Sequence, residues 1–259
     1  MQLASKGREA YPAVLKAEDP TFDHVGPSAI PVRTRPQDVP REMTITEIEE
    51  YIQLFTQAAK NAVFEAGFDG VEIHAANGFM IDQFLQDVSN QRTDKYGGSI
   101  EARSRFGLEV TDAIVAAVGP ERTSIRLSPF NTFNGKSYLQ HLRDLVMTFL
   151  LLRIDMGMAD PLPQFAHFVT ALKERHPNLA YLHLIEPRAT GDQSRVPGDH
   201  ESNDLLREIW QPRPYISAGG YDRESAIQDA DEKGVLVAFG RMYTSNVCPF
   251  CNYYAVNHF

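Results

Sequence analysis

Short apolar runs that alternate with stretches of helical periodicity constrain the fold of this chain more than any other feature. The clearest runs cover residues 68–74, 124–128, 180–185, 215–218 and 236–240. Each is almost continuously apolar, which is typical of parallel strands in a sheet covered by helices. With residues 2–3 counted as the tail of an earlier strand, the sequence predicts six strands. Their alternation with helices favours an α/β fold of the (β/α)8 TIM barrel type, as a single domain over 1–259.

Capping and periodicity predict where the helices begin and end. Thr44 and Glu47 have the spacing of a capping box, and apolar residues follow at helical spacing as far as Gly67. Further helices are expected over 100–118, 164–175, 204–209 and 223–233. Residues 8–43 are rich in proline and charged residues, so we expect a long loop there.

Composition excludes several classes of partner. The 259 residues are 43% apolar and carry a net charge of −9, which argues against nucleic acid or an anionic membrane as partner. The longest apolar run, 145–152, is interrupted by Thr148 and is far too short to span a membrane. Cys248 and Cys251 form a lone pair without the second pair that a zinc site needs. We therefore expect a soluble, cytoplasmic protein without a metal.

The segment 70–79 is the strongest candidate for chemistry. An apolar strand ends there by presenting His74 and Asn77, two neutral donors that can hold one carbonyl oxygen without a metal. Phe79, two positions later, has no ionisable proton to donate. Other polar residues and glycines lie within or just after the later predicted strands. In a barrel, the carboxyl ends of all strands open on the same side, so these residues would lie near one another. They are Arg126, Glu186, Gly219-Gly220 and Gly240-Arg241.

Several motifs resemble the old yellow enzyme family of FMN-dependent ene reductases. They are GFDGVEIHAANG at 67–78, DQFL at 82–85, SN at 89–90, RTDKYGGSIE at 92–101, RSRF at 103–106, RLSP at 126–129, HLIEPR at 183–188, AGG at 218–220 and FGR at 239–241. The similarity covers most of residues 1–135 and 157–246. It implies FMN as cofactor, NADPH or NADH as hydride donor, and an enone or enal as small-molecule substrate. The sequence makes no prediction of the oligomeric state.

The resemblance also implies roles for single positions. His74 and Asn77 match the pair that holds the substrate's carbonyl oxygen, with Phe79 beside them in the substrate site. Gln2 matches a glutamine that contacts the pyrimidine edge of the flavin, and Arg126 matches the arginine near flavin N1 and O2, where a cation stabilises the anionic reduced form. The phosphate site of the family matches Gly219, Gly220, Gly240 and Arg241.

Simpler interpretations of the same residues stay open. Arg126 could be a buried salt-bridge partner for Glu72 or Glu186, and the glycine pairs could form plain turns. The run 92–105 reads as a polar network that braces the loop and the next helix, and Asp94 and Glu101 are not expected to form a general acid/base pair.

Four departures from the family pattern affect the expected function. Phe79 replaces a tyrosine that protonates the α-carbon, so the proton must come from water or another group. Some relatives with phenylalanine there, in fungal ergot-alkaloid pathways, are thought to isomerise rather than reduce. The first two strand–helix units of the barrel are missing, residues 136–155 read as a non-family insertion, and the tail 247–259 diverges.

Two hypotheses of function follow. The first is an FMN-dependent NAD(P)H oxidoreductase that reduces or isomerises the C=C bond of an α,β-unsaturated carbonyl compound, in fungal specialised metabolism. The alternative is a non-catalytic fragment or pseudoenzyme from a truncated or mis-spliced gene. A metal-dependent barrel hydrolase would need a ligand cluster that the sequence does not supply.

Overall fold

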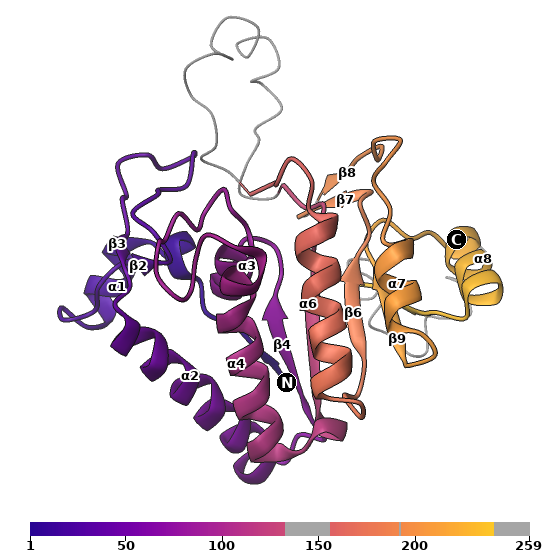
Figure 1. The fold of residues 1–259 in the computed structure, drawn as a ribbon, viewed down its shortest axis with the longest axis horizontal. Coiled ribbons are helices and arrows are strands. Elements are labelled where there is room, and N and C mark those ends of the chain that lie inside the picture. The colour runs from indigo at the N-terminus through magenta and orange to yellow at the C-terminus, as the bar shows by residue number, and fades with distance from the viewer. Residues whose placement is uncertain (133–155, 192, 241–259) are drawn as a thin grey trace, which may run out of the picture.

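A six-stranded parallel sheet forms the centre of the computed structural model, which describes residues 1–132, 156–191 and 193–240 (Figure 1). The strand order is β1-β4-β5-β6-β9-β10, and each neighbouring pair is parallel. The strands are β1 (Gln2–Leu3), β4 (Val71–Ala75), β5 (Thr123–Leu127), β6 (Leu182–Ile185), β9 (Tyr215–Ala218) and β10 (Leu236–Ala238). The prediction of six strands, with residues 2–3 as the first, is confirmed.

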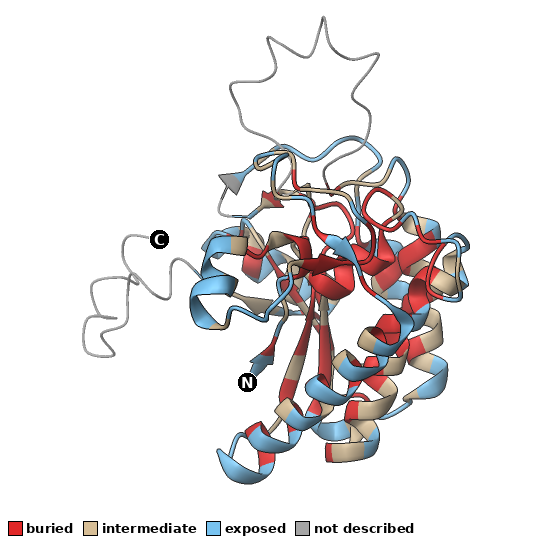
Figure 2. Ribbon diagram, turned by 90° about the vertical axis from the view of Figure 1, so that its left-hand side faces the viewer, coloured by how far each residue is buried: buried red, intermediate tan, exposed pale blue. Residues whose placement is uncertain are grey.

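The long helices pack on one side of this sheet, as the two views in Figures 1 and 2 agree. The helices are α2 (Ile45–Lys60), which continues into the π-helical turn η2 (Asn61–Glu65), α3 (Met80–Leu85), α4 (Ile100–Val118), α6 (Leu162–Arg175), α7 (Asp204–Trp210) and α8 (Arg223–Lys233). Helices therefore follow strands β4, β5, β6 and β9 along the chain, as expected for strand–helix units. No helix of the described ranges is long and apolar enough to cross a membrane.

Alternation within the strands separates an apolar face from a polar one. In β4, Val71, Ile73 and Ala75 are buried in the main hydrophobic core, which also contains residues of α2, α4 and α6. Because successive side chains of a strand point to opposite faces, Glu72 and His74 lie on the other face of the sheet. We call this second side the polar face. In β5 the same alternation places Ser124 and Arg126 on it.

The predicted capping signals are formed. Thr44 Oγ1 accepts a hydrogen bond from the Glu47 backbone N–H at 3.2 Å, and Glu47 Oε2 accepts one from the Thr44 N–H at 2.7 Å. Ser99 caps the first residue of α4 through the Ala102 N–H, and Gly119, with φ of 95°, ends it. These signals explain why the predicted bounds of 100–118 match the observed helix.

The prediction of a long loop over 8–43 is wrong where short elements interrupt this region. This region contains the 3-10 turn η1 (Gly7–Glu9), helix α1 (Pro12–Glu18) and a parallel pair formed by β2 (Val25–Gly26) and β3 (Arg41–Glu42). Proline at the first position favours the start of α1, but none of its residues is buried. The loop was predicted from its content of proline and charged residues, and α1 gave no signal against it because its apolar residues 13–15 are consecutive and not at helical spacing.

A few smaller features also differ from expectation. The turn η3 (Pro120–Arg122) precedes β5, and β7 (Ala189–Thr190) pairs antiparallel with β8 (Gln193–Ser194). Strand β4 begins at residue 71 instead of 68, and β10 ends at 238 instead of 240. The expected insertion 136–155 and divergent tail 247–259 lie outside the described residues.

Candidate functional site

Three polar side chains meet where β4, β5 and β6 run side by side. His74 on β4 is the register partner of Arg126 on β5, and Arg126 is in turn the partner of His183 on β6. All three lie on the polar face, and His74 and Arg126 lie close to the carboxyl ends of their strands. Functional residues of parallel α/β sheets gather at these ends, so this is the candidate active site.

The imidazole of His74 is a neutral hydrogen-bond donor. The side chain is buried, and this burial, aided by the positive charge of Arg126, lowers its pKa to about 4. Nδ1 lies 3.2 Å from the Ala76 backbone N–H and accepts a hydrogen bond from it. In a neutral imidazole the proton then resides on Nε2. His74 thus presents an Nε2–H donor at neutral pH.

Asn77 lies in a tight turn directly after β4. Asn77 and Gly78 have φ values of 56° and 76°, a left-handed conformation that asparagine and glycine tolerate best. Ser128 Oγ accepts the Asn77 N–H at 2.7 Å, and Asp82 Oδ2 accepts the Gly78 N–H at 2.8 Å. The amide of Asn131 donates to Asn77 Oδ1. Neighbouring segments therefore fix both the backbone and the side chain of this turn.

Phe79 packs against the imidazole. The two rings stack with their centroids 4.4 Å apart and 22° between their planes. Phe79 is also the N-cap residue of α3, so the turn leads directly into that helix. The aromatic ring braces His74 and carries no proton that it can transfer.

Arg126 is a half-buried cation whose buried Nε has no hydrogen-bond partner among the described residues. Burial lowers the pKa of its guanidinium, and the nearby charge of Glu72 opposes this effect. Within the described part of the chain, no carboxylate lies within 4.0 Å of Arg126 as an ion-pair partner. The open interpretation of Arg126 as a salt-bridge partner of Glu72 or Glu186 is therefore not borne out by the geometry.

Glu72 instead joins β1 to β6 across the polar face. Its Oε2 lies 2.9 Å from His183 Nδ1, and its Oε1 accepts a hydrogen bond of 2.5 Å from Gln2 Nε2. Burial raises the pKa of Glu72, but hydrogen bonding and charge attraction from His183 outweigh this and bring it to about 2. Gln2, an expected flavin contact, is thus held beside Glu72 and one strand away from His74.

The glycines after β9 form a crowded turn. Gly219 and Gly220 have φ values of 103° and 68°, and a Cβ on Gly219 would lie 2.8 Å from Ala189 Cβ. The Arg188 side chain covers this turn: its Nε donates to Gly219 O at 2.9 Å, and its guanidinium lies 3.9 Å from the Tyr221 ring centroid. Among the described residues, Arg188 Nη2 has no hydrogen-bond partner, but Asp229 Oδ2 lies 3.7 Å from it as an ion-pair partner. An anion here would meet a guanidinium whose charge Asp229 partly balances.

The remaining expected residues are less informative. Gly240 follows β10 and is exposed, and a Cβ there would contact nothing within 4 Å. Arg241 lies outside the described residues. The structure therefore brings His74, Asn77, Phe79 and Arg126 together, and places Gly219-Gly220 two strands from β5 in the sheet order.

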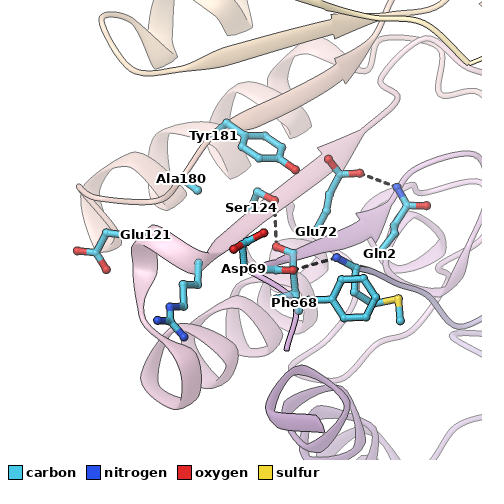
Figure 3. Close-up of a pocket in the computed structure, with 12 residues that line it drawn as sticks. Gln2, Phe68, Asp69, Glu72, Glu121, Ser124, Ala180 and Tyr181 are labelled. Carbon is cyan, nitrogen blue, oxygen red and sulfur yellow. Dashed lines mark hydrogen bonds between the residues drawn. The ribbon is translucent and has the colours of Figure 1, made fainter. Parts of the chain in front are cut away.

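A cavity of about 460 Å³ opens at the other end of the strands (Figure 3). Gln2, Glu72, Ser124 and Tyr181 line it together with Asp69 and other residues near the amino ends of β4 and β5. It lies next to the Glu72 network but does not include His74 or Asn77. Among the residues that the structure describes, no group of His, Cys, Asp or Glu side chains could hold a metal ion.

Sequence reasoning missed three residues that support the Asn77 turn. Ser128, Asp82 and Asn131 contact it from the loop after β5 and from α3. Ser128 and Asp82 lie inside the quoted motifs, so the motifs themselves were the available signal. Asn131 lies just beyond RLSP, and no pattern in the sequence links it to Asn77.

Comparison with known proteins places this site in context. The family profile "NADH:flavin oxidoreductase / NADH oxidase family" matches residues 1–248. The chain is 44% identical over 255 residues to "Probable inactive reductase easA" of Epichloe festucae var. lolii, covering 95% of this chain and 60% of that protein. It is 43% identical over 250 residues to "Chanoclavine-I aldehyde reductase fgaOx3" of Penicillium roqueforti (strain FM164), with 95% and 61% covered.

Solved structures show the same similarity in three dimensions. The old yellow enzyme from Pichia sp. AKU4542 matches with a TM-score of 0.75 and 32% identity, covering 95% of this chain and 59% of that one. Morphinone reductase matches with a TM-score of 0.74 and 32% identity, covering 93% and 61%. The chain spans about 60% of the length of the curated relatives it matches.

Proposed function

Because the chain belongs to the NADH:flavin oxidoreductase / NADH oxidase family, that of the old yellow enzymes, we propose that it is an FMN-dependent NAD(P)H oxidoreductase. Its substrate is an α,β-unsaturated carbonyl compound of fungal specialised metabolism, whose C=C bond it reduces or isomerises. We assign the six strands to strands three to eight of a (β/α)8 barrel, with the first two strand–helix units outside this sequence.

The observation that carries this proposal is the pair of oriented neutral donors. His74 presents Nε2–H because Ala76 occupies Nδ1, and its pKa of about 4 keeps it neutral at physiological pH. Asn77 follows three positions later on a fixed turn. Donors of this kind stabilise negative charge that develops on a carbonyl oxygen, by about 3 kcal/mol each. Their role here is to polarise the carbonyl of the substrate.

Features of the polar face fit FMN. The buried Nε of Arg126 has no hydrogen-bond partner in the described part of the chain, and a cation beside the pair suits the electron-rich side of a flavin. The Gly219-Gly220 turn, covered by Arg188, fits the phosphate of the cofactor. The chemistry that FMN supplies when bound is transfer of a hydride, taken from NADPH or NADH, to the β-carbon of the substrate.

Phe79 separates polarisation of the carbonyl from delivery of the final proton. Its ring lies against His74 where the resemblance expects a tyrosine hydroxyl. Protonation of the α-carbon would then depend on water. Where this proton transfer is slow, rotation about the former C=C bond followed by loss of the added hydride would give isomerisation instead of reduction. Reduction is favoured by one relative that is named an aldehyde reductase.

Reconstitution with FMN tests the proposal. Purified protein mixed with FMN and desalted should be yellow, and NADPH should bleach it anaerobically. Cyclohex-2-enone should reoxidise the wild type, whereas His74→Ala and Asn77→Ala should each slow this step by about 100-fold. The control is His200→Ala, which removes an exposed histidine far along the chain from the site. A colourless protein that binds no FMN would refute the proposal for this chain.

A non-catalytic role is the second candidate. It is favoured by the word "inactive" in the name of one similar protein and by β1 and β10, which are the two edges of the described sheet. Thermal unfolding distinguishes the two. A cooperative transition that saturating FMN shifts upward supports the enzyme, and one that FMN leaves unchanged supports the non-catalytic role.

A further inference from the structure

Asn131 fixes the orientation of the Asn77 side chain. It lies in the loop after β5, is only 3% exposed, and donates a hydrogen bond from Nδ2 to Asn77 Oδ1. Its own backbone N–H donates to Ser128 O at 3.2 Å, and Ser128 Oγ accepts the Asn77 N–H at 2.7 Å. Two hydrogen bonds thus join the loops that follow neighbouring strands: one reaches the Asn77 side chain and one reaches its backbone N–H.

The direction of this hydrogen bond matters for the chemistry. The amide of asparagine has a donor end and an acceptor end, and either can face a ligand. A carbonyl oxygen that gains negative charge needs a donor. Asn131 donates to Oδ1 of Asn77. Nδ2, the donor end of the same amide, therefore points away from Asn131. The Ala76 N–H acts on His74 in the same manner by engaging Nδ1.

We propose that Asn131 is a positioning residue that sets the Asn77 amide with its donor end toward the substrate oxygen. It makes the site favour ligands with a strong acceptor oxygen, such as a carbonyl oxygen or a phenolate, over alcohols, whose neutral hydroxyl oxygen is a weaker acceptor. This inference rests on the proposed function, because it concerns the same oxygen-binding pair. The inference adds Asn131, a residue of a second loop, to the residues that support the pair. In this role Asn131 contacts neither the ligand nor the cofactor.

Substitutions of Asn131 separate orientation from packing. Asn131→Ala removes the donor and lets the Asn77 amide rotate. Asn131→Asp keeps the size of the side chain, but an ionised carboxylate only accepts hydrogen bonds, so it attracts Asn77 Nδ2 and reverses the amide. The second substitution also preserves the fold if the alanine variant is unstable.

A double-mutant cycle tests the proposal on the FMN-loaded protein. The probe is 4-hydroxybenzaldehyde, added at a pH above the pKa of its phenol so that it binds as the phenolate. Binding is followed by the change in flavin absorbance. We expect Asn131→Ala to weaken binding about 10-fold and Asn131→Asp to weaken it more. In an Asn77→Ala background, Asn131→Ala should have no further effect, because its action passes through Asn77.

The outcomes distinguish this inference from the proposed function. If the wild type binds the probe and Asn131→Ala binds equally well, or if the two alanine effects multiply in the double variant, the positioning role is overturned while the proposed function stands. If the wild type binds neither FMN nor the probe, the proposed function fails and the inference fails with it. Unchanged FMN affinity and melting temperature in the Asn131 variants show that a lost fold does not cause the weaker binding.

Discussion

Replacing Glu72 with glutamine removes a negative charge from the polar face while keeping the size of the side chain. Glu72 accepts hydrogen bonds from Gln2 Nε2 at 2.5 Å and from His183 Nδ1 at 2.9 Å. A glutamine has one acceptor oxygen for these two donors, so one of them loses its partner or must rotate. The exposed Gln2 can rotate its amide, whereas His183 lies in the interior of the sheet.

The pKa of Glu72 sets the size of the effect. Burial raises this pKa, but hydrogen bonding and charge attraction from His183 prevail and lower it from 4.5 to about 2. A shift of this size stabilises the folded state by about 3 kcal/mol. Glutamine keeps part of the hydrogen bonding, so we expect Glu72→Gln to lower the free energy of unfolding at pH 7 by about 2 kcal/mol.

The pH dependence has a definite sign. Because the folded-state pKa is lower than the unfolded-state value of 4.5, the stabilisation is present above that pH and is lost as the pH falls toward 2. The difference in stability between wild type and Glu72→Gln should therefore shrink as the pH falls from 5 to 3. Urea unfolding followed by circular dichroism at several pH values measures it.

The matched control is Glu121→Gln, which makes the same change in net charge. Glu121 is an exposed residue that lines the same cavity (Figure 3). It should change the free energy of unfolding by less than about 0.5 kcal/mol. If Glu72→Gln behaves like this control at pH 7, the argument that the Glu72 network stabilises the polar face is refuted.

Three further substitutions test the cofactor and substrate sites. Gly219→Ala should destabilise the fold by more than about 1 kcal/mol and abolish FMN retention, because the new Cβ would crowd Ala189. The control in thermal melts is Gly234→Ala, since Gly234 also has a positive φ but has open space where the Cβ would lie. Arg126→Met should raise the stability of the apoprotein by about 1 kcal/mol, because it removes a cation whose buried Nε has no partner among the described residues. The same substitution should weaken FMN binding at least tenfold. An unchanged FMN affinity in a fluorescence titration would contradict the assigned role. Phe79→Tyr should increase the yield of saturated product from cyclohex-2-enone several-fold in chromatographic assays, and an unchanged yield would show that the α-carbon proton does not limit the reaction.

Local signals explain how much of the fold was predictable. Helix α4 was predicted with its observed bounds because Ser99 caps its start and Gly119 ends it. Helix α1 was missed because its apolar residues 13–15 are consecutive and not at helical spacing, and none of its residues is buried. The extension of α2 by a π-helical turn has no signal that we recognise.

The candidate site was predictable in its members but not in their orientation. The positions of His74 and Asn77 follow from the end of an apolar strand. The resemblance to the old yellow enzyme family suggested that Phe79 and Arg126 lie beside them, and the comparisons confirm the family. The Nε2–H form of His74 and the direction of the Asn77 amide depend on single hydrogen bonds. The second of these joins residues 54 positions apart, and only the packing of two loops brings them together.

The two-residue alternation of β4 limits how such a site can evolve. Inserting or deleting one residue in this strand would turn Glu72 and His74 into the helix layer and expose Ile73 on the polar face. Both the core and the site would be lost in one step. Changes of substrate range are therefore confined to the loops that follow the strands, around 77–79 and 128–131, where a substitution alters the binding surface without altering the register. Libraries that aim at new substrates belong in these loops, with Asn77, Ser128 and Asn131 kept unchanged.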